Sequence, residues 1–298
     1  MTGCISQIQH GSTGDGPGLR TTVFFSGCNL RCTWCHNPET QRAQPTLLWY
    51  ADRCTGCGVC AAVCQTGAHR FENGIHTLDR SACVACGACA AICPESGLVL
   101  SAQQMTLEQV MTEIDADRAF YQASGGGVTF SGGEPLLQPD FARALCEACR
   151  ENGYHLLLDT AGDASPEIFR DLAARFDAIY FDWKTATPED CKTYTGGNFE
   201  RILSNLESAL QSNADVTVRI PLIPGVNDAE EKLHTMGKTL QGVGAKQVCV
   251  IPFHRLGSGK YKALGMAYEF AEIQPMPRAK LQEAAALLAQ YGFAVTTE

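Results

Sequence analysis

Residues 27–39 read GCNLRCTWCHNPE, and they follow directly on the apolar stretch Arg20–Ser26. This pattern predicts a strand that ends in a loop carrying Cys28, Cys32 and Cys35 at the spacing C-x3-C-x2-C. Three thiolates at this spacing can hold an iron–sulfur cube and leave its fourth iron open, which is where a substrate binds a metal. His36 could be the fourth ligand, but it adjoins Cys35 and is not expected to reach the remaining iron, so we favour an open site.

Eight further cysteines form two copies of the spacing C-x2-C-x2-C-x3-C. This spacing is typical of two-cluster ferredoxins, in which the fourth cysteine of each run binds the other cluster. We therefore predict one 4Fe–4S cluster on Cys54, Cys57, Cys60 and Cys93, and a second on Cys83, Cys86, Cys89 and Cys64. Structural zinc is the alternative, but it uses pairs of CxxC knuckles and fits a duplicated run of four poorly. The first run has Gln65 where the second has Pro94, which affects packing beside the cluster rather than ligation.

The overall composition limits the class of protein. The chain has 298 residues and a formal net charge of −9, with no block of lysine and arginine, so neither charge nor sequence favours a nucleic-acid partner. No apolar run approaches the roughly 18 residues of a membrane span, and the start Met1–Cys4 lacks the regions of a signal peptide. We therefore expect a soluble, cytoplasmic protein without a membrane partner. In such a protein a count of 16 cysteines favours metal ligation over disulfide bonds.

Apolar runs alternate with amphipathic segments along the rest of the chain, which predicts repeated β-α units and a parallel α/β architecture. The six expected strands are Arg20–Ser26, Gly127–Ser131, His155–Thr160, Ala178–Lys184, Val216–Leu222 and Gln247–Phe253. Residues 46–100 interrupt this alternation, so we expect an inserted small domain there, with residues 1–45 and 101–298 forming the α/β part.

Capping residues predict where the helices begin. Thr106 and Gln109 form a capping box that opens a helix through about Gln122, and Pro139 begins a helix that stops near Gly153. Ser165-Pro166 and Thr187-Pro188 each place an N-cap before a proline, Asn227 is expected to cap a further helix, and Pro277 starts the last one.

Each expected strand ends in an unusual motif. Because reactive groups of parallel β/α barrels lie on loops at the carboxyl ends of strands, six such motifs predict one composite site. They are the three-cysteine loop, Ser131–Pro135, Asp159–Gly162, Asp182–Lys184, Arg219 with Pro221–Gly225, and Pro252–His254.

At these residues the chain resembles the radical S-adenosylmethionine (SAM) superfamily and, within it, the glycyl radical enzyme activating enzymes similar to pyruvate formate-lyase activating enzyme. The resemblance rests on DGPGLR (15–20), CHNPE (35–39), SGGEPL (131–136) and the double ferredoxin-like insert. It implies a partial (β/α)6 TIM-like barrel with an inserted small α+β domain of the bacterial ferredoxin type.

The resemblance also implies an activity, that of an oxidoreductase of anaerobic metabolism. SAM binds the open iron, and one-electron reduction cleaves it to methionine and a 5′-deoxyadenosyl radical, which takes hydrogen from a glycine of a partner glycyl radical enzyme. Flavodoxin or ferredoxin would donate the electron, and the extra clusters would deliver it or only brace the partner interface. A radical SAM enzyme of a small molecule and an iron–sulfur electron carrier are the alternative functions.

Residue roles follow from the same resemblance. Cys28, Cys32 and Cys35 hold the reactive cluster, and Lys184, the remaining catalytic candidate, meets the SAM carboxylate or sulfonium side together with His254 and Arg219. The glycine-rich turn contacts the methionine ammonium, and an aromatic residue of the cysteine loop lies near adenine. The turn consists of Gly132, Gly133 and Glu134, and a plain loop is the alternative for it. The aromatic residue is Trp34, which could instead pack against the cluster. For Arg219 the alternative is a solvated strand end.

Asp159, Thr160 and Asp182 resemble residues that hold a monovalent cation beside SAM, although such carboxylates could instead cap a helix or pair with Lys184. Trp183 replaces an aliphatic residue, and strand alternation should point it away from its two neighbours. Asp15 and Arg20 would shape the entrance for the partner's glycine loop, or form only a turn with its ion pair. The remaining cysteines, expected to be buried and structural, are Cys4, Cys146, Cys149, Cys191 and Cys249.

Overall fold

The computed structural model describes residues 1–298 and is built on one curved sheet of nine strands in the order β13-β12-β11-β10-β9-β8-β2-β1-β7. In this order the seven strands from β13 to β2 are parallel to one another, while β1 and β7 are antiparallel additions at one edge. Their bounds are β1 (Thr2–Ser12), β2 (Arg20–Phe25), β7 (Gln103–Thr106), β8 (Gly127–Gly132), β9 (His155–Thr160), β10 (Ala178–Asp182), β11 (Asp215–Leu222), β12 (Gln247–Pro252) and β13 (Ala294–Thr297). All six expected strands are confirmed within two residues at each end.

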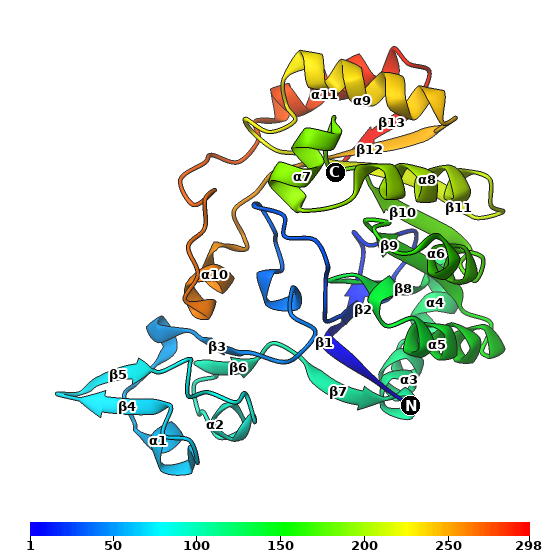
Figure 1. The fold of residues 1–298 in the computed structure, drawn as a ribbon. Coiled ribbons are helices and arrows are strands. Elements are labelled where there is room, and N and C mark those ends of the chain that lie inside the picture. Colours follow the sequence, from blue (N-terminus) through cyan, green and yellow to red (C-terminus); the bar gives the residue numbers. More distant parts are fainter.

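Helices cover the outer side of this sheet, which arcs from β13 down to β1 and opens towards α10 (Figure 1). The two edge strands, β13 and β7, do not pair with each other. The sheet is therefore open, and the α/β part is a partial barrel. The helices are α3 (Leu107–Ala116), α4 (Arg118–Ser124), α5 (Pro139–Glu151), α6 (Pro166–Ala173), α7 (Pro188–Thr195), α8 (Phe199–Leu210), α9 (Glu230–Gly242), α10 (Ser258–Leu264) and α11 (Arg278–Ala289). None of them is both long and apolar enough to cross a bilayer.

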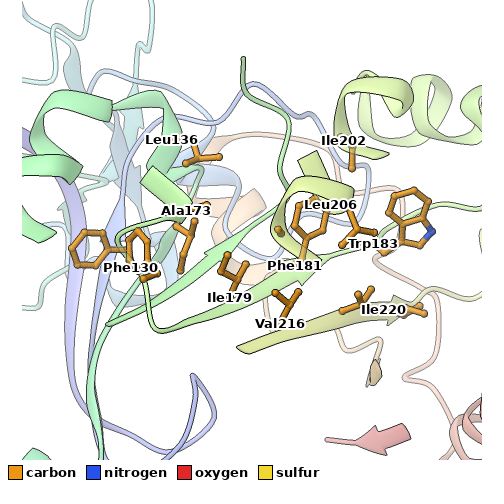
Figure 2. Packing of buried hydrophobic residues seen from close by; sticks show 14 of the residues in the cluster. Phe130, Leu136, Ala173, Ile179, Phe181, Trp183, Ile202, Leu206, Val216 and Ile220 are labelled. Carbon is orange, nitrogen blue, oxygen red and sulfur yellow. The ribbon is translucent and has the colours of Figure 1, made fainter. Parts of the chain in front are cut away.

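The main core lies between the sheet and these helices, as Figure 2 shows for Phe130, Phe181 and Leu206. Trp183 extends this core beyond the end of β10: it is 1% exposed, and its ring packs 5.2 Å from that of Phe199 on α8. The expectation that Trp183 points away from the polar residues on either side of it is therefore confirmed, and its size serves packing.

Three of the expected N-caps are confirmed. Thr106 and Gln109 form the reciprocal capping box of α3, and the side chains of Ser165 and Thr187 accept hydrogen bonds from the first turns of α6 and α7. The helix expected to run to Gln122 is interrupted, however. Asp117 lies between α3 and α4, and its buried carboxylate accepts a 2.5 Å hydrogen bond from Thr21 of β2.

Asn227 does not cap a helix, and that expectation was wrong. Helix α9 starts at Glu230 after Ala229, which gives no side-chain cap. The Asn227 amide is fully buried instead: its oxygen accepts from the Ile223 N–H at 2.7 Å, and its nitrogen donates to the carbonyls of Lys184 and Pro221. It thus ties the loop after β10 to the loop after β11. Pro277 is the residue just before α11 rather than its first residue.

Residues 46–100 form two small antiparallel sheets and two short helices beside α10 (Figure 1). The elements are β3 (Leu47–Trp49), η2 (Ala51–Arg53), α1 (Val59–Val63), β4 (His69–Glu72), β5 (Ile75–Leu78), α2 (Ala88–Ala91) and β6 (Leu98–Leu100). Pairing of β3 with β6 brings Leu47 opposite Leu100, so the segment leaves the larger sheet and returns at one place. Leu47, Cys60, Cys89 and Leu98 form a core separate from that of the larger sheet.

Candidate active site

A cavity of about 280 Å³ lies at the carboxyl ends of the parallel strands. The six motifs of the expected composite site all reach it, from the cysteine loop after β2 to the loop after β12. The expected site residues that line it are Cys28, Cys32, Trp34, Cys35, Gly132, Gly133, Asp159, Thr160, Asp182, Lys184, Arg219 and His254. Because the edge of a parallel sheet gathers these strand ends, residues more than 200 positions apart share one cavity.

The cysteine loop has no regular secondary structure between β2 and η1 (Pro38–Thr40) and is held by backbone hydrogen bonds to distant elements. The N–H groups of Arg31 and Thr33 donate to the carbonyls of Thr195 and Tyr194 at the end of α7, at 2.7 and 3.0 Å. Burial raises the pKa of Cys28 and Cys32 to about 12, so the thiols must lose protons when they bind iron. Three thiols on one side of a partly polar cavity are a donor set that suits an iron–sulfur cluster.

Two ion pairs share the cavity with the cysteines. Lys184 Nζ donates to Asp182 Oδ2 at 2.6 Å, and Arg219 lies 3.6 Å from Asp159 Oδ1. Burial alone would lower the pKa of Lys184. The negative charges of Asp182 and Cys32 have the larger combined effect and raise this pKa above its ordinary value. Pairing of Asp182 with Lys184, one of the alternatives left open by the sequence, is therefore the arrangement found. Asp159 Oδ1 is buried without a hydrogen bond.

The glycine-rich turn divides into two parts with different roles. Gly132 and Gly133 line the cavity, and a Cβ on Gly133 would lie 2.2 Å from the Gly27 carbonyl, so only glycine allows this approach to the cysteine loop. Glu134 is not among the lining residues: it is 1% exposed, and its carboxylate accepts hydrogen bonds from the Thr160 hydroxyl and the Ala161 N–H. Burial raises the pKa of Glu134 to about 7. The side chain therefore joins the β8 and β9 loops rather than facing the cavity.

Aromatic and imidazole rings form another wall. Trp34 is 8% exposed and packs 6.4 Å from the rings of Tyr194 and Phe270. His254 Nδ1 is buried without a hydrogen-bond partner, and its ring meets that of His36 edge to face at 4.3 Å. Burial, with a smaller contribution from His254, lowers the pKa of His36 to about 4, so this ring is neutral.

Sequence reasoning missed two residues of α10 that hold the cysteine loop. The Tyr261 hydroxyl donates to the Cys35 carbonyl at 3.0 Å, and Lys260 Nζ donates to Asn37 at 2.6 Å and pairs with Glu39 at 2.5 Å. Helix α10 is only seven residues long and was not expected. A half-buried lysine and a buried tyrosine in a short segment carry no spacing that could have identified them.

Asp15 and Arg20 lie away from the cysteines, at the amino end of β2. Asp15 accepts hydrogen bonds from Ser12 and Thr22, whereas Arg20 is fully buried and donates to Thr129 and to the carbonyl of Val128. Both are thus engaged within the barrel wall, and a role at the entrance for a glycine loop stays a prediction.

The cysteines of residues 46–100 line two further cavities. Cys54, Cys57, Cys60 and Cys93 surround the first, and Cys64, Cys83, Cys86 and Cys89 lie around the second. In each cavity the fourth cysteine comes from the other run. Gly58 and Gly87 adopt φ angles of 75° and 81° directly before α1 and α2, a turn that glycine makes without strain. The remaining cysteines are buried, with no disulfide: Cys4, Cys146, Cys149, Cys191 and Cys249.

Comparison with known proteins agrees with this geometry. The family model described as the radical SAM superfamily matches residues 22–236. The chain belongs to the radical SAM superfamily.

Among curated radical SAM relatives, the choline trimethylamine-lyase activating enzyme of Oleidesulfovibrio alaskensis is 38% identical over 98% of this chain and 96% of its own length. The benzylsuccinate synthase activating enzyme of Thauera aromatica is also 38% identical, over 98% of this chain and 91% of its own length. A radical SAM methyltransferase from Sphaerobacter thermophilus, 14% identical, has a similar fold, with a TM-score of 0.57 over 99% of this chain and 76% of that one.

The contact between Thr160 and Glu134 yields a pH-dependent prediction. Thr160→Val removes the hydroxyl that donates to the Glu134 carboxylate at 2.7 and 2.9 Å. Hydrogen bonds to charged groups contribute about 2 kcal/mol, so the variant should lose about that much free energy of unfolding near pH 8. The loss should be smaller near pH 6, because below its pKa of about 7 Glu134 is protonated and no longer needs a donor.

Chemical unfolding of Thr160→Val and of the control Thr160→Ser at both pH values measures this difference. Thr160→Ser keeps the hydroxyl and should behave as the natural protein. An equal loss for Thr160→Val at the two pH values would contradict an ionised Glu134 as the acceptor.

Proposed function

We propose that this protein is a glycyl radical enzyme activating enzyme, which cleaves SAM reductively and takes a hydrogen atom from a glycine of a partner enzyme. The observation that carries the proposal is the meeting of Cys28, Cys32 and Cys35 with Lys184 and Arg219 in one cavity. The relatives that share nearly the whole chain are activating enzymes by name. The partner of this protein is accordingly a glycyl radical enzyme.

The cavity offers complementary groups for each part of SAM. When bound to the three cysteines, a 4Fe–4S cluster would coordinate SAM and supply the electron that releases the 5′-deoxyadenosyl radical. Lys184 and Arg219 are the cations available to the carboxylate, and His254 Nδ1 is a buried polar atom free to bind ligand. Trp34 gives an apolar wall for adenine. The glycines Gly132 and Gly133 bring backbone groups to the cavity, so the ammonium group would be bound there by carbonyl oxygens.

A monovalent cation beside SAM forms part of the proposal. Asp159 and Asp182 both line the cavity, and Asp159 Oδ1 is a buried oxygen without a hydrogen bond. Burial raises the pKa of Asp159 to about 6, while Arg219 acts in the opposite direction. A cation close to Oδ1 would supply the direct contact that Arg219, at 3.6 Å, does not make. Thr160 is the weaker candidate ligand, because its hydroxyl already donates to Glu134.

We further propose that residues 46–100 are an inserted ferredoxin-like domain with two 4Fe–4S clusters, giving three clusters in all. The two cavities, each surrounded by three cysteines of one run and one of the other, support this ligation. The domain contacts the cysteine loop indirectly, since Leu48 of β3 packs on Ala263 and Leu264 of α10, and Tyr261 of the same helix bonds Cys35. We propose that this domain delivers electrons from flavodoxin or ferredoxin to the reactive cluster; the alternative is a purely structural role.

The assigned activity is tested by replacing Cys28, Cys32 and Cys35 with alanine in the full chain. The variant should form no 5′-deoxyadenosine from SAM and dithionite above background, because no thiolate remains to hold the reactive cluster. The matched control is Cys146→Ala with Cys149→Ala, a CxxC buried in α5, which should keep the activity. Continued 5′-deoxyadenosine formation by the triple variant would exclude this site as the place of SAM cleavage.

Electron delivery is tested by replacing Cys54, Cys57, Cys60, Cys83, Cys86 and Cys89 with alanine. This variant should lose the 5′-deoxyadenosine formation driven by reduced flavodoxin but keep the rate driven by dithionite, which reaches the reactive cluster directly. An unchanged flavodoxin-driven rate would leave the inserted domain with a structural role only.

A further inference from the structure

Two histidines of the inserted domain are buried between its two cysteine cavities. His69 on β4 and His76 on β5 are 5% and 7% exposed, and they belong to the hairpin at the end of the domain farthest from the barrel (Figure 1). His76 lines the cavity of Cys54, whereas His69 lines that of Cys64. Nothing in the proposed activity requires either ring, and buried imidazoles need partners for both nitrogens.

The contacts of these rings form a chain that ends on a cluster cysteine. His69 Nδ1 lies 2.9 Å from His76 Nε2, and His76 Nδ1 lies 3.5 Å from Cys54 Sγ. A thiolate can only accept, so the hydrogen must be on His76 Nδ1. His76 Nε2 is then an acceptor, and the hydrogen between the rings is on His69 Nδ1. One set of tautomers therefore satisfies these two contacts with neutral rings. His76 Nε2 also lies 3.8 Å from Cys60 Sγ, and with Nε2 as acceptor this longer approach is a packing contact and not a hydrogen bond.

Packing fixes the direction of this donor. The His76 ring is stacked on Phe71, the residue opposite it in the hairpin, with centroids 4.6 Å apart and an interplanar angle of 4°. Trp49 holds it from another side at 4.6 Å. Trp49 also lines this cavity, and its Nε1 is buried without a hydrogen-bond partner, so Trp49 carries a further N–H donor that is still unused.

We propose that His76, oriented by His69, donates a hydrogen bond to the Cys54 thiolate and thereby raises the reduction potential of the cluster on Cys54, Cys57, Cys60 and Cys93. Donation to a ligand sulfur stabilises the reduced, more negative cluster more than the oxidised one. The other cluster has a different environment, in which Cys64 accepts from the Ala68 N–H at 3.3 Å and contacts the Thr66 hydroxyl. The histidine pair therefore makes the two clusters unequal.

This inference rests on the two clusters of the proposed function, so the experiment measures their number first. The full chain with Cys28, Cys32 and Cys35 replaced by alanine is reconstituted, which leaves about eight irons, the content of two cubane clusters. Potentials are then measured by a redox titration monitored by EPR. The variants are His76→Leu, which removes the donor, and His76→Asn, whose amide nitrogen takes the place of Nδ1. His10→Leu, at a half-exposed histidine of β1, is the control.

In His76→Leu we expect the reduction potential of one of the two clusters to fall by about 59 mV. For a one-electron couple this is a tenfold change in the reduction equilibrium. The other potential should not change, His76→Asn should recover most of the fall, and His10→Leu should match the parent. Unmoved potentials in His76→Leu, or an equal fall in His76→Asn, would overturn the hydrogen bond while leaving the clusters in place. An iron content well below eight would instead refute the two-cluster proposal and this inference with it.

A second measurement covers the case in which His76→Leu does not assemble its cluster. The parent protein is labelled with 15N-histidine, reduced, and examined by pulsed EPR. A 15N coupling to a reduced cluster is expected, because the reactive cluster beside His36 has been removed and only His69 and His76 approach the others. The lack of any such coupling would overturn the proposal.

Discussion

The loop that carries Cys28, Cys32 and Cys35 contains no helix or strand, so its shape depends strongly on hydrogen bonds to distant parts of the chain. The end of α7 holds its middle through Arg31 and Thr33, and α10 holds its end through Tyr261 and Lys260. These anchors come from residues about 160 and 225 positions further along. The arrangement of the three thiols around one cavity is therefore a property of the folded barrel and not of the loop sequence alone.

Charge within the cavity follows from the same constraint. Lys184 and Arg219 both lie in the site as members of ion pairs. Lys184 pairs with Asp182 at the end of its own strand β10, and Arg219 of β11 pairs with Asp159 of β9, two strands away. An unpaired buried charge would be costly, whereas paired charges can turn towards a zwitterionic ligand such as SAM. The partly exposed ion pairs and the free His254 Nδ1 give the cavity the polar character that a purely electron-carrying protein would not need.

Much of this organisation was predictable from sequence, because the information is local. Spacing placed the cysteines, strand alternation placed Asp182, Trp183 and Lys184, and side-chain capping placed the starts of α3, α6 and α7. Prediction failed where tertiary contacts decide. Asn227 bonds three backbone groups instead of capping, and the helix expected to run to Gln122 ends at Asp117, whose carboxylate accepts a hydrogen bond from Thr21. Strand β1 was not expected because much of it is polar and exposed, and it is specified by pairing with β2 and β7.

The measurement that tests the central claim most directly is an EPR spectrum of the partner. The protein is reconstituted anaerobically to about twelve irons, the content of three cubane clusters, and mixed with SAM, reductant and a glycyl radical enzyme encoded beside it. A doublet from a carbon-centred radical on that partner, formed together with 5′-deoxyadenosine, is the predicted result. Formation of 5′-deoxyadenosine without a protein radical on any such partner, but with turnover of a small molecule, would contradict the account.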